Sequence, residues 1–220
     1  SRNEVQIGQA NLKCIDMAFK LYMSVWKKVF SSKSLFLSDG FLRQDIHIII
    51  MHEFRHIGHC AMSFYDYSTL ITKHHSYFSS MPIEVTNILN RLDIRKVWTV
   101  ELLTIAPEFR RGKIEVDIYQ VIIQVLMKTI RDLRARHVIA PIVNTNSASR
   151  EGQNHGELIA KNIDYKGLNC DFLHMDYQKV PDIKNSDLVT KVNNLYMPYQ
   201  SKIQLLSNEE RENGELKEAS

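Results

Sequence analysis

The chain has 220 residues, of which 44% are hydrophobic and 24% are charged. This is the composition of an ordinary globular protein, and the length suits one sizeable core. The formal net charge of +3 is too small to indicate nucleic-acid binding, although it is compatible with an anionic small molecule or an acidic partner.

Three elements are predicted in the first half of the chain. Apolar side chains recur at steps of three and four over residues 9–30, which predicts a helix. Residues 45–66 are rich in β-branched and aromatic side chains, so we predict two antiparallel strands with a turn at residues 55–58. Pro82 can occupy the first turn of a short helix that runs to Leu92.

The second half begins with the clearest strand, residues 97–105. After a loop at 108–112, an apolar stripe from Ile114 to Leu133 predicts a long helix. Residues 137–143 are apolar throughout, which is typical of a buried strand. The remaining predictions are a helix over 147–162, a strand over 172–180 and a helix over 186–196.

This order of elements predicts an α+β fold, in which a mixed sheet is covered by helices on both faces. We expect one domain over residues 1–206 and a polar, disordered tail over 207–220. The longest unbroken apolar run, residues 48–51, is too short to cross a membrane, so no transmembrane segment is predicted. The widely spaced cysteines form no CxxC pair, which favours a reducing, cytoplasmic location.

The loop before the long helix has the chemistry of an anion site. A helix N-terminus presents unpaired backbone N–H groups and the positive end of the helix dipole. The loop also carries Arg110, Arg111 and Lys113, and Gly112 allows the backbone to approach a ligand closely. A phosphate or pyrophosphate is the natural occupant of such a site.

The segment ELLTIAPEFRRGK resembles the strand-to-helix signature of the GNAT acyltransferases, where an apolar strand leads through Pro-Glu-aromatic-Arg into a pyrophosphate loop. The similarity spreads over roughly residues 12–180. AFKLYMSVWKKVF and FLSDGFLRQDIHII resemble the first helix and the following stretch of the branch that contains N-acyl amino acid synthases and acyl-homoserine-lactone synthases. The resemblance implies a GNAT-like, mostly antiparallel central sheet.

The resemblance also implies roles for individual residues. Glu101 falls where that branch carries a glutamate on its central strand, and we predict that it is the base that deprotonates the attacking amine. The alternative role of Glu101 is structural, as an edge or surface carboxylate of the strand that pairs with Arg95 or Lys96. The oxyanion would be stabilised by backbone N–H groups near Thr104, Ile105 and Ala106. Donor phosphate would be held by Arg110, Arg111, Gly112 and Lys113. The aromatic side chains of Trp26, Phe30 and Trp98 would line an acyl or acceptor pocket or belong to the core. Tyr165 and His174 are candidate acids that protonate the leaving group.

The loop departs from the family pattern Arg/Gln-x-x-Gly-x-Gly/Ala. Counted from Arg110, Lys113 and Glu115 stand where glycine or alanine is expected, and Gly112 comes one position early. This departure argues against CoA pyrophosphate held in the common way. It favours the synthase branch, for which the resemblance implies acyl carrier protein as a frequent donor.

Residues 52–56, HEFRH, match the H-E-x-x-H zinc motif. On a helix, His52 and His56 would share one face and bind zinc, with Glu53 as general base. The isoleucine-rich stretch before the motif instead favours a strand, where residues four apart lie about 13 Å apart at ~3.3 Å per residue. That separation is too large for one tetrahedral metal ion, so no metal ligands are predicted.

The sequence therefore predicts an N-acyltransferase that moves an acyl group, in this branch a long chain, from a thioester donor to the amine of an amino acid or similar small acceptor. The donor would be acyl-CoA or acyl carrier protein, with no permanently bound cofactor and no nucleic-acid partner. Two alternatives remain open: a zinc-dependent hydrolase that uses the HEFRH segment, and a catalytically inactive GNAT-like binding module.

Overall fold

The computed structural model describes residues 12–29, 38–52, 55–110, 117–144 and 148–179, together with 187, 188, 190 and 192–194. At its centre lies a six-stranded sheet in the order β1-β2-β3-β4-β6-β5. Its strands are β1 (Ile46–His52), β2 (Arg55–Asp66), β3 (Lys96–Ile105), β4 (Val138–Val143), β5 (Glu157–Tyr165) and β6 (Leu168–Met175). Within this sheet β3 and β4 are parallel, and the other neighbouring pairs are antiparallel.

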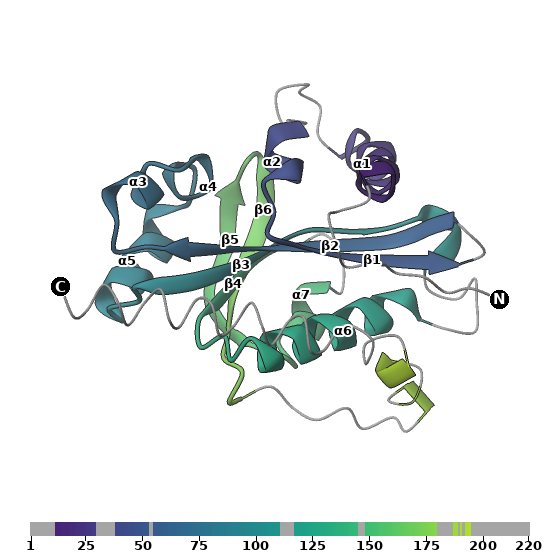
Figure 1. The fold of residues 1–220 in the computed structure, drawn as a ribbon. Coiled ribbons are helices and arrows are strands. Elements are labelled where there is room, and N and C mark those ends of the chain that lie inside the picture. Colours follow the sequence, from purple (N-terminus) through teal and green to yellow (C-terminus); the bar gives the residue numbers. More distant parts are fainter. Residues whose placement is uncertain are drawn as a thin grey trace.

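Helices cover both faces of the sheet, which confirms the predicted α+β fold. They are α1 (Leu12–Trp26), α2 (Ser38–Leu42), α3 (Leu70–Lys73), α4 (Ser76–Ser79), α5 (Ile83–Arg91), α6 (Ile118–Asp132) and α7 (Ala148–Gly152). Figure 1 shows α1 and α2 over one face and α6 and α7 over the other, with α3–α5 gathered at one end. We call these the α1 face and the α6 face of the sheet.

The α6 face carries the largest apolar cluster because α6 presents a continuous apolar stripe to β1–β4. Gly58 lets this helix lie close to the sheet, since a Cβ there would meet Ile122 Cδ1 at 2.7 Å. The predicted turn at residues 55–58 is therefore wrong. Gly58 lies inside β2, paired with Ile50 and Ile105, and the hairpin bends between His52 and the start of β2.

The other helix predictions differ in how far they hold. The helix predicted over 9–30 is present as α1, and residues 9–11 and 30 lie outside the described residues. The helix predicted over 147–162 is wrong beyond Gly152, because the chain continues as β5, which pairs with β6 in a hairpin. The predicted tail over 207–220 also lies outside the described part of the chain.

The strands β3 and β4 run side by side only at their beginnings. Their ladder ends at the pair Thr99–Ile139. His137 O accepts a hydrogen bond from Trp98 N at 2.8 Å, so alternation directs the backbone groups of odd-numbered β4 residues toward β3. Pro141 occupies one of these positions and has no N–H to donate, which prevents the ladder from continuing.

A bulge on β3 widens the separation. The register with β2 passes from Ala61–Glu101 to His59–Thr104, so three steps along β3 oppose two along β2. Leu102 has φ of 62°, in the left-handed region that L-residues rarely adopt. Beyond Thr99, β3 and β4 therefore leave a gap in the sheet, and the bulge lies on its border.

Replacing Gly58 by Ala tests how closely β2 packs on α6. The new Cβ would lie 2.7 Å from Ile122 Cδ1 and 3.2 Å from Ile118 Cγ2, so we expect a loss of about 1–3 kcal/mol in the free energy of unfolding. Gly40→Ala is the matched control, because nothing lies within 4 Å of that Cβ and Gly40 is helical. Urea unfolding compares the two; equal stabilities would contradict the close packing.

Candidate active site between two parting strands

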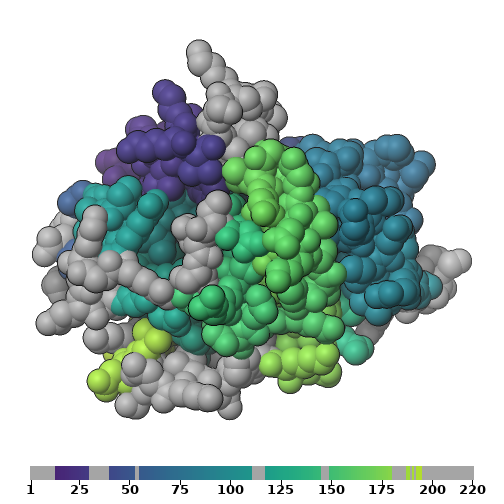
Figure 2. All heavy atoms as spheres, turned by 180° about the vertical axis from the view of Figure 1, so that it is seen from behind, coloured from purple at the N-terminus to yellow at the C-terminus, as the bar shows by residue number. Residues whose placement is uncertain are grey.

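A cavity of about 690 Å³ fills the gap between β3 and β4. Its volume lies within the ~300–1,000 Å³ typical of small-molecule sites. The lining comes from α1, β3, α6, β4 and the β5–β6 hairpin. Figure 2, seen from behind, shows a hollow among α1 (purple), the teal residues and the green β5–β6 region.

The part of the cavity on the α6 face is apolar. It is lined by Val100, Leu103, Ile123, Leu126, Met127 and Met175, all of which belong to the α6-face cluster or pack against it. These side chains offer dispersion contacts and no hydrogen-bonding groups apart from weak thioether acceptors. This half of the cavity can therefore hold an alkyl chain.

Glu101 marks the polar part of the cavity. Side chains along β3 point to alternate faces of the sheet, and because Val100 lies on the α6 face, Glu101 points to the α1 face. There, Thr99 Oγ1 donates a hydrogen bond to Glu101 Oε1 at 3.3 Å. Burial raises the pKa of Glu101, while the charge of Lys166 and hydrogen bonds from Thr99 and Gln44 oppose that rise. A carboxylate with a raised pKa beside a cavity has the properties of a general base.

Tyrosines surround this carboxylate on the α1 face. Burial and the charge of Glu101 raise the pKa of Tyr22 and of Tyr65 to about 12, and both also raise the pKa of Tyr165 and Tyr77. Each phenol is therefore protonated at neutral pH and can donate a hydrogen bond. Tyr77 Oη and Tyr165 Oη are buried, and neither has a hydrogen-bond partner among the described residues. The hydroxyl of Ser80 is close enough to Tyr165 to oppose the rise of its pKa, but the two groups do not form a hydrogen bond of normal geometry.

The N-terminus of α6 is already occupied by a side chain. Asp117 caps the helix, and its Oδ1 accepts from Tyr119 N at 3.0 Å and from Gln120 N at 3.4 Å. An anionic ligand would compete with this carboxylate for the same donors. Arg110 lines the cavity and donates to Ile105 O at 3.3 Å; the predicted phosphate ligands Arg111, Gly112 and Lys113 lie outside the described residues.

The structure brings only some of the other proposed site residues to the cavity. Trp26 lines it and donates from Nε1 to Thr104 Oγ1 at 2.9 Å, whereas Phe30 lies outside the described part of the chain. Trp98 packs in the core on the α6 face and is not part of the cavity lining. Ala106 N already donates to Ile57 O at 2.9 Å, so this N–H group is not available to an oxyanion.

A buried histidine pair supports the bulge. His59 Nδ1 lies 3.3 Å from Leu102 O, and His59 Nε2 lies 3.0 Å from His47 Nδ1. A carbonyl can only accept, so His59 carries its proton on Nδ1 and accepts at Nε2 from His47. Burial lowers the pKa of His59 to about 3 and of His47 to about 4, in agreement with two neutral rings. Thr104 Oγ1 donates to the same carbonyl at 2.8 Å.

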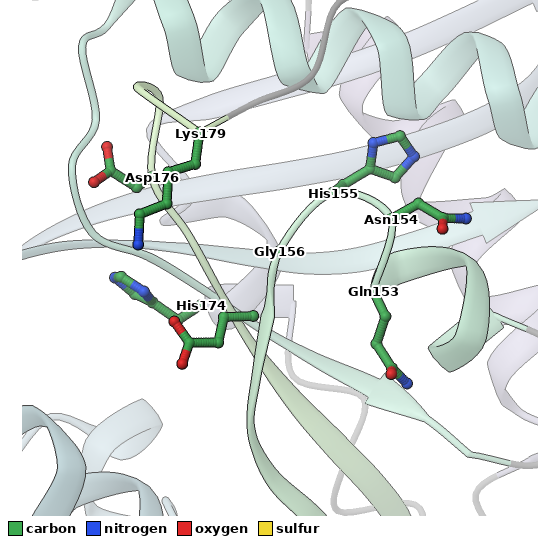
Figure 3. A pocket seen from close by; sticks show the side chains of 8 residues that line it. Gln153, Asn154, His155, Gly156, His174, Asp176 and Lys179 are labelled. Atoms are coloured by element: carbon green, nitrogen blue, oxygen red, sulfur yellow. The ribbon is translucent and has the colours of Figure 1, made fainter.

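A smaller polar pocket of about 290 Å³ lies elsewhere, at the ends of β5 and β6 (Figure 3). His174, Asp176 and Lys179 gather there, while His155 points away from them. His174 Nε2 lies 3.0 Å from His137 Nδ1, and His174 does not line the larger cavity. His155 lines both, and its buried Nδ1 finds no hydrogen-bond partner in the described ranges.

The HEFRH segment does not form the helix that a zinc site would need. His52 and His56 lie on opposite strands of the β1–β2 hairpin, where His52 pairs with Arg55 and His56 with Met51. Glu53 lies outside the described residues. Within the part of the chain that the structure describes, no group of three or more His, Cys, Asp or Glu could hold a metal ion.

Sequence reasoning missed several residues of this site. Tyr22 and His59 occupy apolar faces in their segments, and nothing in the sequence separates them from ordinary core residues. Lys166 was missed because the residues before it were predicted as a helix, so the hairpin that contains it was not predicted. The Lys166–Gly167 pair between two apolar runs is, however, a recognisable hairpin signal.

The histidine support predicts a pH-dependent stability. Because the pKa of His59 is lower in the folded than in the unfolded chain, stability should fall as pH drops through about 6 toward 3. His59→Phe keeps the ring stacked on Phe41 but removes the bonds to Leu102 O and His47, which should cost about 1–3 kcal/mol at pH 7 and flatten this pH dependence. Urea unfolding at a series of pH values measures both, with exposed His74→Gln as control; an unchanged profile in His59→Phe would contradict the assignment.

Comparison with known proteins places the fold. No family model and no curated relative matches the sequence. Similar solved structures include FeeM, an N-acyl amino acid synthase from uncultured soil microbes (TM-score 0.54, 9% identity, 78% of this chain and 94% of that chain). They also include the AHL synthase LasI (TM-score 0.53, 8% identity, 80% of this chain and 94% of that chain). A third is an acyl-CoA N-acyltransferase from Pseudomonas aeruginosa (TM-score 0.51, 10% identity, 76% of this chain and 93% of that chain).

At such low identity the likeness concerns the fold, and the fold agrees with the resemblance seen in ELLTIAPEFRRGK. No helix among the described residues has the length and apolar character needed to span a membrane. The chain has the fold of the GNAT acyltransferases.

Proposed function

We propose that the protein is an N-acyltransferase that moves an acyl group from a thioester donor to the amine of an amino acid or similar small acceptor. The observation that carries this proposal is the position of Glu101, a half-buried carboxylate with a raised pKa at the point where an apolar cavity passes between β3 and β4. The fold shared with N-acyltransferases and synthases supports it.

In this proposal the acyl chain occupies the apolar half of the cavity and the thioester carbonyl lies beside the bulge at Leu102. Glu101 takes a proton from the acceptor ammonium, directly or through water, and the neutral amine attacks the carbonyl carbon. The C–N bond forms, and the oxyanion is stabilised by backbone N–H groups of the bulge. As the C–S bond breaks, the nitrogen gives up its second proton and the leaving thiolate gains one; a phenol such as that of Tyr165 passes the proton between them and is regenerated.

Asp117 bears on the choice between the two thioester donors. Its carboxylate occupies two of the N–H groups at the start of α6 and adds a negative charge there. CoA pyrophosphate would have to be held without those donors. We therefore favour acyl carrier protein, whose pantetheine arm enters the cavity without a pyrophosphate at this position, over acyl-CoA.

The direct test incubates the protein with acyl carrier protein and CoA thioesters from acetyl to dodecanoyl and a mixture of amino acids and amines, with products identified by mass spectrometry. N-acylated products should form, and Glu101→Gln should reduce their rate by about 10²–10⁴-fold. No product with any donor, or full activity in Glu101→Gln, would overturn the proposal.

Stability separates a catalytic from a structural role of Glu101. The pKa of Glu101 is raised in the folded state, so wild-type stability should fall as pH rises above about 4.5. Glu101→Gln should therefore be at least as stable as wild type at pH 7 while it loses turnover. An inactive but destabilised variant would indicate a structural role instead.

The donor preference is tested by binding. Wild type should bind acyl-CoA and acyl-pantetheine with similar affinity, since the α6 N-terminus gives little to the pyrophosphate. Asp117→Ser keeps a capping side chain and removes the charge, so the affinity for acyl-CoA should rise about twofold to fivefold, the equivalent of ~0.3–1 kcal/mol. Acyl-pantetheine, which has no pyrophosphate, is the control. Calorimetry that shows acyl-CoA already far tighter in wild type would contradict this account.

A further inference from the structure

The turn that joins β5 to β6 contains a lysine in an unfavourable conformation. Lys166 and Gly167 have φ of 55° and 76°, and they connect the paired residues Tyr165 and Leu168. Such two-residue turns need positive φ at both central positions, which favours Asn, Asp or Gly. A lysine in the left-handed region costs roughly 1–2 kcal/mol. Residues held against such a cost are found mainly at sites of function.

The ammonium group of Lys166 lies over aromatic rings rather than beside a carboxylate. Its Nζ is 5.0 Å from the centre of the Tyr165 ring and 5.9 Å from that of Tyr77. Within the described ranges, no Asp or Glu side chain forms an ion pair with Lys166. Cation–π attraction of this kind is worth only about 0.5–1 kcal/mol at an exposed site, so the ammonium remains able to bind an anion.

Lys166 and Glu101 lie on the same cavity. Both line it, together with Tyr165, and the charge of Lys166 acts on the Glu101 carboxylate. Glu101 is half-buried within the polar part, whereas Lys166 is exposed at its edge. The cavity thus presents a carboxylate inside and an ammonium at the rim, with the ring of Tyr165 next to that ammonium. A ligand that carries an amine at one end and an anionic group at the other has the complementary charge pattern.

We propose that Lys166 binds the carboxylate of the acceptor and thereby selects amines that carry an acidic group. This inference rests on the proposed function, since it assigns the acceptor's amine to Glu101. Lys166 does not take part in bond making; it sets the orientation of the acceptor, so that the amine points inward along the tyrosines. The unfavourable turn conformation is then the cost of holding an ammonium at this rim.

The experiment compares amino acids with their primary amides, which keep the amine and lose the negative charge. Ligand-observed NMR measures binding of leucine, leucinamide, phenylalanine and phenylalaninamide, with and without bound acyl-pantetheine. Wild type should prefer at least one of the two amino acids over its amide by about tenfold or more, the equivalent of ~1.4 kcal/mol. In Lys166→Asn the ratio should fall to about one. Lys161→Met, an exposed lysine of β5 outside the cavity lining, is the matched control.

Lys166→Asn also provides an internal check on folding. Asn suits the left-handed position, so the variant should melt at a higher temperature than wild type although it has lost the preference for the acid. In a transfer assay the loss should appear in KM for the amino acid rather than in kcat. An unchanged acid-to-amide ratio in Lys166→Asn, or no such preference in wild type, would overturn the proposal.

The binding and transfer readouts also separate the two proposals. A Lys166-dependent preference for the acid without transfer from any thioester would leave this assignment standing and overturn the proposed function. Transfer to amino acids and amides alike would do the reverse.

Discussion

The parting of β3 from β4 is the constraint on which the rest of the site depends. A parallel ladder continues only while each strand offers a donor and an acceptor in register, and Pro141 removes the donor that β4 would direct toward β3. The bulge at Leu102 breaks the regular repeat of β3 over the same stretch. Freed backbone groups inside a protein must be satisfied elsewhere. The side chains of His59 and Thr104 do this for Leu102 O, which holds the gap open without an orphaned carbonyl.

Because the gap passes through the sheet, one cavity meets two environments. On the α6 face it borders the main apolar cluster, and on the α1 face it borders a carboxylate and several phenols. An alkyl chain gains free energy only in the first environment, and proton transfer needs the second. The sheet thus separates the binding of a chain from acid–base chemistry, and the bulge is where they meet. Burial raises the pKa of Glu101, while the charge of Lys166 and the hydrogen bond from Thr99 limit that rise.

A feature of the fold or the site could be predicted from the sequence where neighbouring residues along the chain determine it, and not where distant residues do. The helix α6 follows from its apolar periodicity and the strand β3 from its run of β-branched, aromatic and leucine side chains, and both are present in the structure. Gly58 misled the hairpin prediction because its role is contact with Ile122, a residue far away in sequence. The bulge at Leu102 could not be foreseen, since an ordinary leucine in an ordinary strand run gives no sign of a register shift set by β2. Glu101 was predicted as the base through family resemblance rather than through any spacing, and its role in catalysis stays a prediction.

Two of the residues that the structure describes in the left-handed region, Leu102 and Lys166, lie at the cavity. Among the described residues other than glycine, positive φ occurs at Asp93, Leu102, Arg134, Asn162 and Lys166. Asp and Asn tolerate the left-handed region, and Arg134 follows the C-cap of α6, where helices commonly end in that conformation. Leu102 and Lys166 are neither Asp nor Asn and do not end a helix, and both line the cavity. Since each costs roughly 1–2 kcal/mol, a chain under selection for stability alone would favour Gly or Asn at both positions. Their joint presence at one cavity argues that its shape and charge, rather than the stability of the sheet, determine these two residues.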